Sequence, residues 1–164
     1  IVTSGNISSL EIGHMSVNPN GRRCSCGWQG CLETYLSEGV ILQDIHDSGV
    51  DTVDIESIGN LISCRDSEES ETARKVLDEK SRLLAYAIKN ITNILSPDIF
   101  LLISRNIGLS TYFADQVREK LEKYPAYPEK HISEILPLQY DPLHAGLGAC
   151  DIVFQSFFMN HAVL

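Results

Sequence analysis

The sequence is poor in basic residues, with 13 lysines and arginines against 22 aspartates and glutamates in 164 residues. Its formal net charge of -9 repels phosphate backbones, so we do not expect this segment to bind DNA directly. It contains no apolar run near the roughly 18 residues that a membrane-spanning helix needs, and no charged-then-apolar signal segment opens it. These absences predict a cytoplasmic protein that is not inserted in a membrane.

Cysteine is scarce as well, and its count of five is odd, so a complete disulfide framework is excluded. Three of the cysteines lie close together, at positions 24, 26 and 31. Cys64 and Cys150 lie far from these in the sequence and are expected to fill core positions. Because residues 1–3 read as a strand entered partway, the chain is expected to be a C-terminal piece of a longer protein.

The hydrophobic pattern predicts alternating helices and strands, which indicates one α/β domain over residues 1–164. A first helix is expected from near Cys31 to Ser48-Gly49, with a weak point at Gly39. Further helices are expected at residues 55–62, from an acidic entrance at residues 67–71 to Ser96-Pro97, and at residues 110–124. Strands are expected at residues 99–103, buried inside a sheet, and at residues 132–138. The small residues at 144–150 are expected to begin a last helix that packs on the sheet.

The clustered cysteines and a nearby histidine have the composition of a zinc site. Zinc favours four thiolate and imidazole ligands, and His14, Cys24, Cys26 and Cys31 supply such a set. A filled tetrahedron leaves no position for water, so this ion would be structural. The alternative is that the cysteines are free buried thiols or an occasional disulfide, with His14 as a polar turn residue. Three cysteines clustered among glycines fit that alternative poorly.

Two carboxylates, Glu11 and Glu33, bracket the cluster. A carboxylate accepts two hydrogen bonds of fixed direction, so carboxylates held by a rigid loop are suited to gripping neighbouring sugar hydroxyls. Alternatively, Glu11 ends a strand in solvent and Glu33 caps the helix that begins near Cys31, where the helix dipole favours negative charge. The residues alone favour this second interpretation.

The segment Glu11-Ile-Gly-His14-Met and the segment from Asn18 to Glu33 together resemble the signature of the ROK family, named for repressors, open reading frames and kinases. A weaker resemblance continues at residues 93–98 and 148–149. The resemblance implies the C-terminal lobe of an actin-like, ribonuclease-H-like fold with a zinc-binding loop. It also implies that Glu11, His14 and Glu33 contact a sugar, so that His14 would use one ring nitrogen for zinc and the other for a sugar hydroxyl.

The resemblance further separates two functional classes. ROK sugar kinases position ATP partly with a glycine-rich turn after the late strand, where this chain has Ile103-Ser104-Arg105. Side chains there would obstruct the close approach of the nucleotide. The chain is therefore more similar to ROK transcriptional regulators of the NagC, Mlc and XylR type, which keep the zinc and sugar motifs.

This similarity implies a sensor of a sugar or sugar phosphate that forms a homodimer or higher oligomer and reaches DNA only through an upstream helix-turn-helix. The alternatives are half of a ROK sugar kinase and a zinc-stabilised interaction module without sugar binding.

Overall fold

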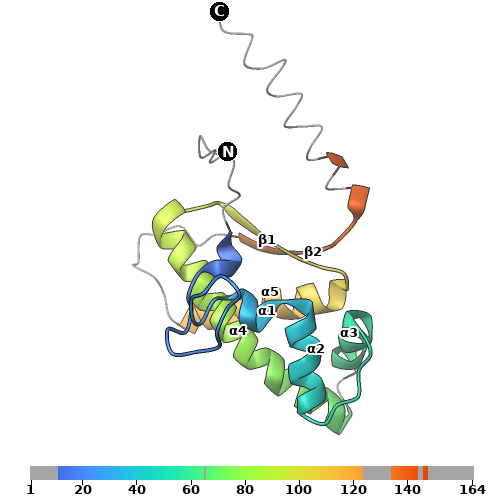
Figure 1. Ribbon diagram of the computed structural model, residues 1–164. Coiled ribbons are helices and arrows are strands. Elements are labelled where there is room, and N and C mark those ends of the chain that lie inside the picture. Colours follow the sequence, from blue (N-terminus) through green and yellow to red (C-terminus); the bar gives the residue numbers. More distant parts are fainter. Residues whose placement is uncertain (1–10, 65, 124–133, 144–145, 148–164) are drawn as a thin grey trace, which may run out of the picture.

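A computed structural model describes residues 11–64, 66–123, 134–143 and 146–147 (Figure 1). The elements follow one another in the order η1 (Ile12–His14), α1 (Glu33–Leu36), α2 (Glu38–Asp47), α3 (Ile55–Ser63), α4 (Glu68–Leu95), β1 (Ile99–Ser104), α5 (Ile107–Lys123) and β2 (Glu134–Gln139). The α/β alternation expected from the sequence is confirmed. The expected strand at residues 1–3 and the body of the expected last helix lie outside the described residues. None of the described helices has the length and hydropathy needed to cross a membrane.

The two strands pair in parallel, with a register that runs from Ile99 opposite Glu134 to Ser104 opposite Gln139. Helix α5 connects them and packs on one face of the sheet, and α4 packs against α5 in the same apolar cluster. That cluster contains Ala85, Ile88, Ala114, Val117 and Ile135, with Phe100 and Leu102 packed against it.

The prediction that the first strand lies buried inside a sheet is wrong for the described part of the chain. Exposed and half-buried residues alternate along β1, and Ile99, Leu101 and Ile103 are 50–55% exposed. Within the described residues β1 has only β2 as a neighbour and helices on only one face, so its second row of aliphatic side chains has no cover.

The long helix α4 agrees closely with its prediction. The Ser67 side chain accepts a hydrogen bond from the Ser70 amide, and three glutamates occupy the first turn, where the helix dipole favours negative charge. The helix ends at Ser96, which adopts a left-handed conformation before Pro97. The buried face of α4 supports the end of the N-terminal loop, because Leu32 packs with Leu83 and Ala87 of this helix.

The helix predicted from near Cys31 ends as expected at Ser48, but it is in fact two helices separated at Ser37, whose backbone is extended (φ -61°, ψ 143°). Gly39, the expected weak point, lies inside α2. The carbonyls of Thr34 and Tyr35, at the end of α1, accept hydrogen bonds from the Arg22 and Lys80 side chains. These long-range donors replace the amides of a following helical turn, which explains why α1 can stop after four residues.

Candidate metal centre

The loop between His14 and Cys31 is folded on itself by short antiparallel bridges, one between Ser16 and Cys31 and one between Arg23 and Gln29. Its turn at Gly30 requires glycine for two reasons. The backbone there has φ +73°, and a Cβ atom would lie 1.7 Å from the Asn18 carbonyl oxygen. A Cβ at this position would therefore force the two sides of the loop apart, moving Cys31 relative to the rest of the cluster.

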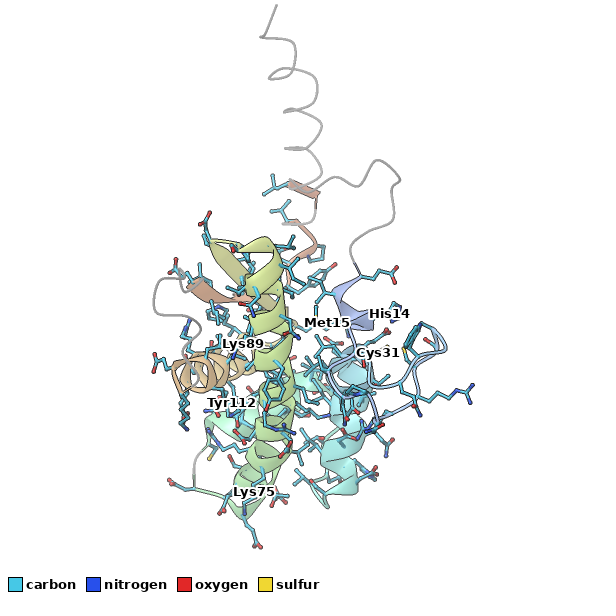
Figure 2. All side chains as sticks on the ribbon, turned by 90° about the vertical axis from the view of Figure 1, so that its left-hand side faces the viewer. His14, Met15, Cys31, Lys75, Lys89 and Tyr112 are labelled. Carbon is cyan, nitrogen blue, oxygen red and sulfur yellow. The ribbon has the colours of Figure 1, made fainter. Side chains whose placement is uncertain are left out.

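The folded loop brings the four predicted ligands together. The donor atoms of His14, Cys24, Cys26 and Cys31 all lie within 4.8 Å of one another. His14 Nδ1 is 3.6 Å from Cys24 Sγ, and Cys26 Sγ is 3.6 Å from Cys31 Sγ. A tetrahedral ion with bonds of about 2.3 Å would place two sulfur ligands about 3.8 Å apart, so these distances fit the edges of such a site. Figure 2 shows His14 and Cys31 beside the long helix α4.

The thiols of the cluster differ in their affinity for protons. A hydrogen bond from the Cys26 backbone, followed by side-chain hydrogen bonds from Cys26, Cys31 and His14, lowers the pKa of Cys24 to about 6. Burial raises the pKa of Cys31 to about 12, because no surface of this residue is exposed. At neutral pH Cys24 would therefore be a ready thiolate, and a divalent cation at the centre of the cluster would favour loss of the Cys31 proton.

The two predicted sugar ligands approach opposite nitrogens of the His14 ring. Glu11 Oε2 lies 3.1 Å from Nε2, and Glu33 Oε2 lies 3.4 Å from Nδ1. The pKa of His14 is raised first by its hydrogen bond to Cys24 and then by the charges of Glu33 and Glu11. With Nδ1 facing the thiols, Nε2 and the Glu11 carboxylate form the imidazole–carboxylate pair that commonly orients metal-bound histidines.

Both interpretations of Glu33 are compatible with its position. It is the first residue of α1, as expected of a residue at a helix N-terminus, and it also faces His14. Its side chain is 51% exposed and that of Glu11 is 62% exposed, so both carboxylates remain open to a ligand from solvent.

Cys64 plays no part in this cluster. The prediction that Cys64 fills a core position is wrong, because Cys64 is exposed at the end of α3. The buried face of α3 ends at Ile62, and Cys64 follows the helix in an extended conformation. Cys150 lies outside the described residues.

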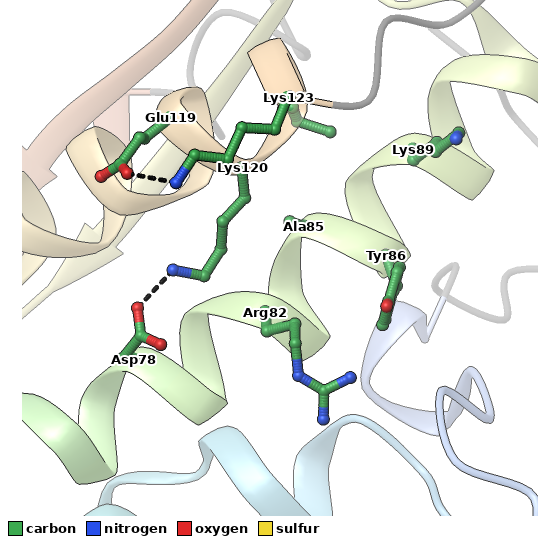
Figure 3. A pocket seen from close by; sticks show the side chains of 9 residues that line it. Asp78, Arg82, Ala85, Tyr86, Lys89, Glu119, Lys120 and Lys123 are labelled. Carbon is green, nitrogen blue, oxygen red and sulfur yellow. Dashed lines mark hydrogen bonds and ion pairs between the residues drawn. The ribbon is translucent and has the colours of Figure 1, made fainter.

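A groove of about 410 Å³ between α4 and α5 lies apart from the cluster (Figure 3). Its cationic side chains are largely neutralised within the chain, since Lys120 pairs with Asp78 and Lys123 pairs with Glu119. We assign no function to this groove.

A set of polar residues behind the loop was not identified from the sequence. They form one ion network, in which the Asp44 carboxylate pairs with both the Arg22 and the Lys80 side chains. The one available signal was Lys80, which lies at helical spacing between the apolar residues Leu77 and Leu84 of α4. A charge within the apolar stripe of a helix requires a buried partner, but the sequence does not say which residue that partner is.

Comparison with known proteins identifies the family of this chain. A family model described as "ROK family" matches residues 2–156. The chain belongs to the ROK family. The xylose repressor of Bacillus spizizenii is 27% identical to it over 158 residues, which cover 91% of this chain and 38% of the repressor. The DNA-binding transcriptional repressor Mlc of Escherichia coli is 49% identical over 43 residues, covering 26% of this chain and 11% of Mlc.

The fold is shared with ROK enzymes as well. The ROK family glucokinase of Streptomyces griseus, solved with glucose and AMPPNP, superposes with a TM-score of 0.70 at 20% identity and covers 87% of this chain. The match covers 50% of the glucokinase chain. At this identity the superposition is evidence for the ROK fold and does not separate repressors from kinases. The chain spans well under half of the length of the repressors that it matches.

Proposed function

We propose that this chain is the sugar-sensing part of a ROK transcriptional regulator and that a structural zinc ion holds its sensing surface in shape. The observation that carries the proposal is the end of β1 and the turn to α5, because the resemblance places the glycines of family kinases at Ile103-Ser104-Arg105. Here the Asn106 side chain caps its own helix by accepting a hydrogen bond from the Leu109 amide at 3.1 Å. It also lies over Gly59 of α3, where an added Cβ would come within 2.0 Å of it.

This arrangement argues against a nucleotide site at the turn. The N-terminus of a helix such as α5 attracts phosphate through its free amides, but here the chain's own amide side chain occupies that position. The neighbouring Arg105 is directed to Glu38 of α2, with Nε 3.4 Å from the carboxylate. The competing candidate is half of a ROK sugar kinase, a class with which this chain shares its fold.

A kinase assay separates these candidates. We expect the full-length protein to transfer no phosphate from ATP to D-glucose, D-xylose or N-acetyl-D-glucosamine, with a ROK glucokinase as the positive control in the same assay. Turnover above about one per second, an ordinary enzyme rate, would overturn the assignment as a regulator.

In this proposal His14, Cys24, Cys26 and Cys31 hold zinc, and the ion performs no chemistry because four protein ligands complete its tetrahedron. Glu11, His14 and Glu33 form the sugar-sensing surface, which is supported by the approach of both carboxylates to the His14 ring. The ligand is a sugar or a sugar phosphate. It can be identified by thermal denaturation against pentoses, hexoses, N-acetylated hexosamines and their phosphates, because a ligand of the folded state raises the midpoint.

The remaining parts of the proposal concern the protein's partners. The charge of -9 suits a cytoplasmic domain that senses and oligomerises, with DNA contacted by a part of the protein outside this chain. We propose a homodimer or higher homo-oligomer, with residues 1–164 acting as one lobe of a ROK protomer.

A further inference from the structure

Lys80 is buried inside the protein, with 3% of its surface exposed. Its Nζ donates a hydrogen bond of 2.8 Å to the Tyr35 carbonyl oxygen of α1 and pairs with the Asp44 carboxylate of α2. Burial lowers the pKa of this lysine, while the bond to Asp44 works in the opposite direction. One ammonium group therefore joins three helices, α1, α2 and α4.

Arg22 reaches the same network from the cysteine-rich loop. Its guanidinium donates to the Thr34 carbonyl at 3.0 Å and to Asp44 at 2.9 Å, and it lies 5.2 Å from the centre of the Tyr35 ring. Its backbone amide donates to the Tyr35 hydroxyl at 3.0 Å. The loop is thus bound both to the backbone and to the aromatic side chain of α1.

These contacts determine the position of a very short helix. Helix α1 has four residues, too few to be stable by itself, and the carbonyls at its end are satisfied by Arg22 and Lys80. Glu33 is the first residue of this helix. The direction of the Glu33 side chain is therefore fixed on one side by Cys31, two positions earlier in the sequence. On the other side it is fixed by the ion network that holds Thr34 and Tyr35.

Stability alone does not account for a lysine at this position. Replacing a buried ion pair with apolar residues of similar volume is often neutral or stabilising, because desolvation of the charges offsets their attraction. What the charges do supply is directed hydrogen bonding to two specific carbonyls of α1, which an apolar side chain cannot provide.

We propose that Lys80, together with Asp44 and Arg22, is a positioning residue for Glu33 and sets the affinity for the sugar without touching it. The inference rests on the proposed sugar-sensing role of Glu33. The network acts as a second anchor of the sensing surface, because the carbonyls that it holds, those of Thr34 and Tyr35, follow Glu33 in the sequence, whereas Cys31 precedes it.

The test compares Lys80→Met with Lys75→Met in the zinc-loaded full-length protein. Lys75 lies on the same helix but is 72% exposed, and its one ion pair within the described part of the chain is with Glu71 at the surface, away from His14 and Cys31 (Figure 2). The probe is whichever tested sugar raises the midpoint of the wild-type protein. We expect Lys80→Met to bind that sugar about tenfold more weakly at unchanged zinc content. A tenfold loss of affinity is about what the loss of one hydrogen bond causes. Lys75→Met should bind it as wild type does.

A double-mutant cycle distinguishes positioning from a general loss of stability. If Lys80 acts through Glu33, Lys80→Met should weaken binding little further in a Glu33→Gln background. Losses that multiply would overturn the proposal, as would wild-type affinity in folded, zinc-loaded Lys80→Met. Should Lys80→Met fail to fold, Arg22→Gln serves instead, because the Arg22 side chain is 44% exposed and its loss leaves no buried charge unpaired.

Failure of the proposed function gives a different pattern. If no sugar shifts the wild-type midpoint, or if Glu33→Gln binds as wild type does, both proposals fail together. If Glu33→Gln weakens binding and Lys80→Met does not, only the positioning role is overturned.

Discussion

Replacing Cys26 with serine is expected to release the metal ion and to unfold the segment between residues 14 and 33 locally. Cys26 is exposed, but its sulfur lies 3.6 Å from that of the fully buried Cys31, so its loss removes one of four donors from a closed cluster. Because the binding free energy of a structural zinc ion is coupled to folding, the cost should be several kcal/mol. Elemental analysis of protein purified without chelators measures the metal, and amide hydrogen exchange measures the local unfolding.

Cys64→Ser is the matched control for this experiment. Cys64 is also an exposed free cysteine, but it lies at the end of α3 and outside the cluster, so its replacement should change neither zinc content nor exchange at residues 14–33. A wild-type protein that carries no metal, or a Cys26→Ser variant with normal metal content and stability, would rule out the zinc site.

Replacing Glu33 with glutamine is expected to lower sugar affinity by roughly tenfold to a hundredfold while the protein remains folded and zinc-loaded. The amide keeps the shape of the side chain but donates where the carboxylate accepts, so a sugar hydroxyl at the His14 surface would lose its partner. Such a loss costs about 1 to 3 kcal/mol. Isothermal titration of the full-length protein with its sugar measures the change.

Glu56→Gln tests whether Glu33 is merely a helix-terminal acid. Glu56 occupies the first turn of α3, as Glu33 does in α1, but among the described contacts it has none with His14. Both replacements should cost about 0.3 to 1 kcal/mol of stability through the helix dipole. If both variants also bind sugar as wild type does, Glu33 serves only the helix and the sugar-site assignment fails.

The clustering of the four candidate ligands could be predicted from the sequence because everything that brings them together is local. The four donors fall within residues 14–31, and the bend that joins them depends on nearby glycines such as Gly30. Helix α4 was equally predictable, since its capping serine, its acidic first turn and its apolar stripe are contiguous in the sequence.

The features that escaped prediction depend on residues far apart in the chain. The break at Ser37 is stabilised by Lys80, which lies 45 positions from the Tyr35 carbonyl that it caps. Apolar periodicity reports which side of a helix is buried, but it carries no information about a hydrogen bond from another helix. Similarly, the run at residues 99–103 has the composition of a strand buried on both faces, and only the arrangement of its neighbours shows that one face is uncovered in the described part of the chain.

The uncovered aliphatic row on β1 has a practical consequence for work with this chain in isolation. Ile99, Leu101 and Ile103 stand beside their register partners on β2, two of which, Leu136 and Leu138, are also aliphatic. Such a surface favours association between copies of the chain, and the electrostatic repulsion that arises from the net charge of -9 opposes this association. Added salt screens this repulsion and strengthens apolar association, so dilute buffers of low ionic strength are the better choice for keeping the isolated chain dispersed.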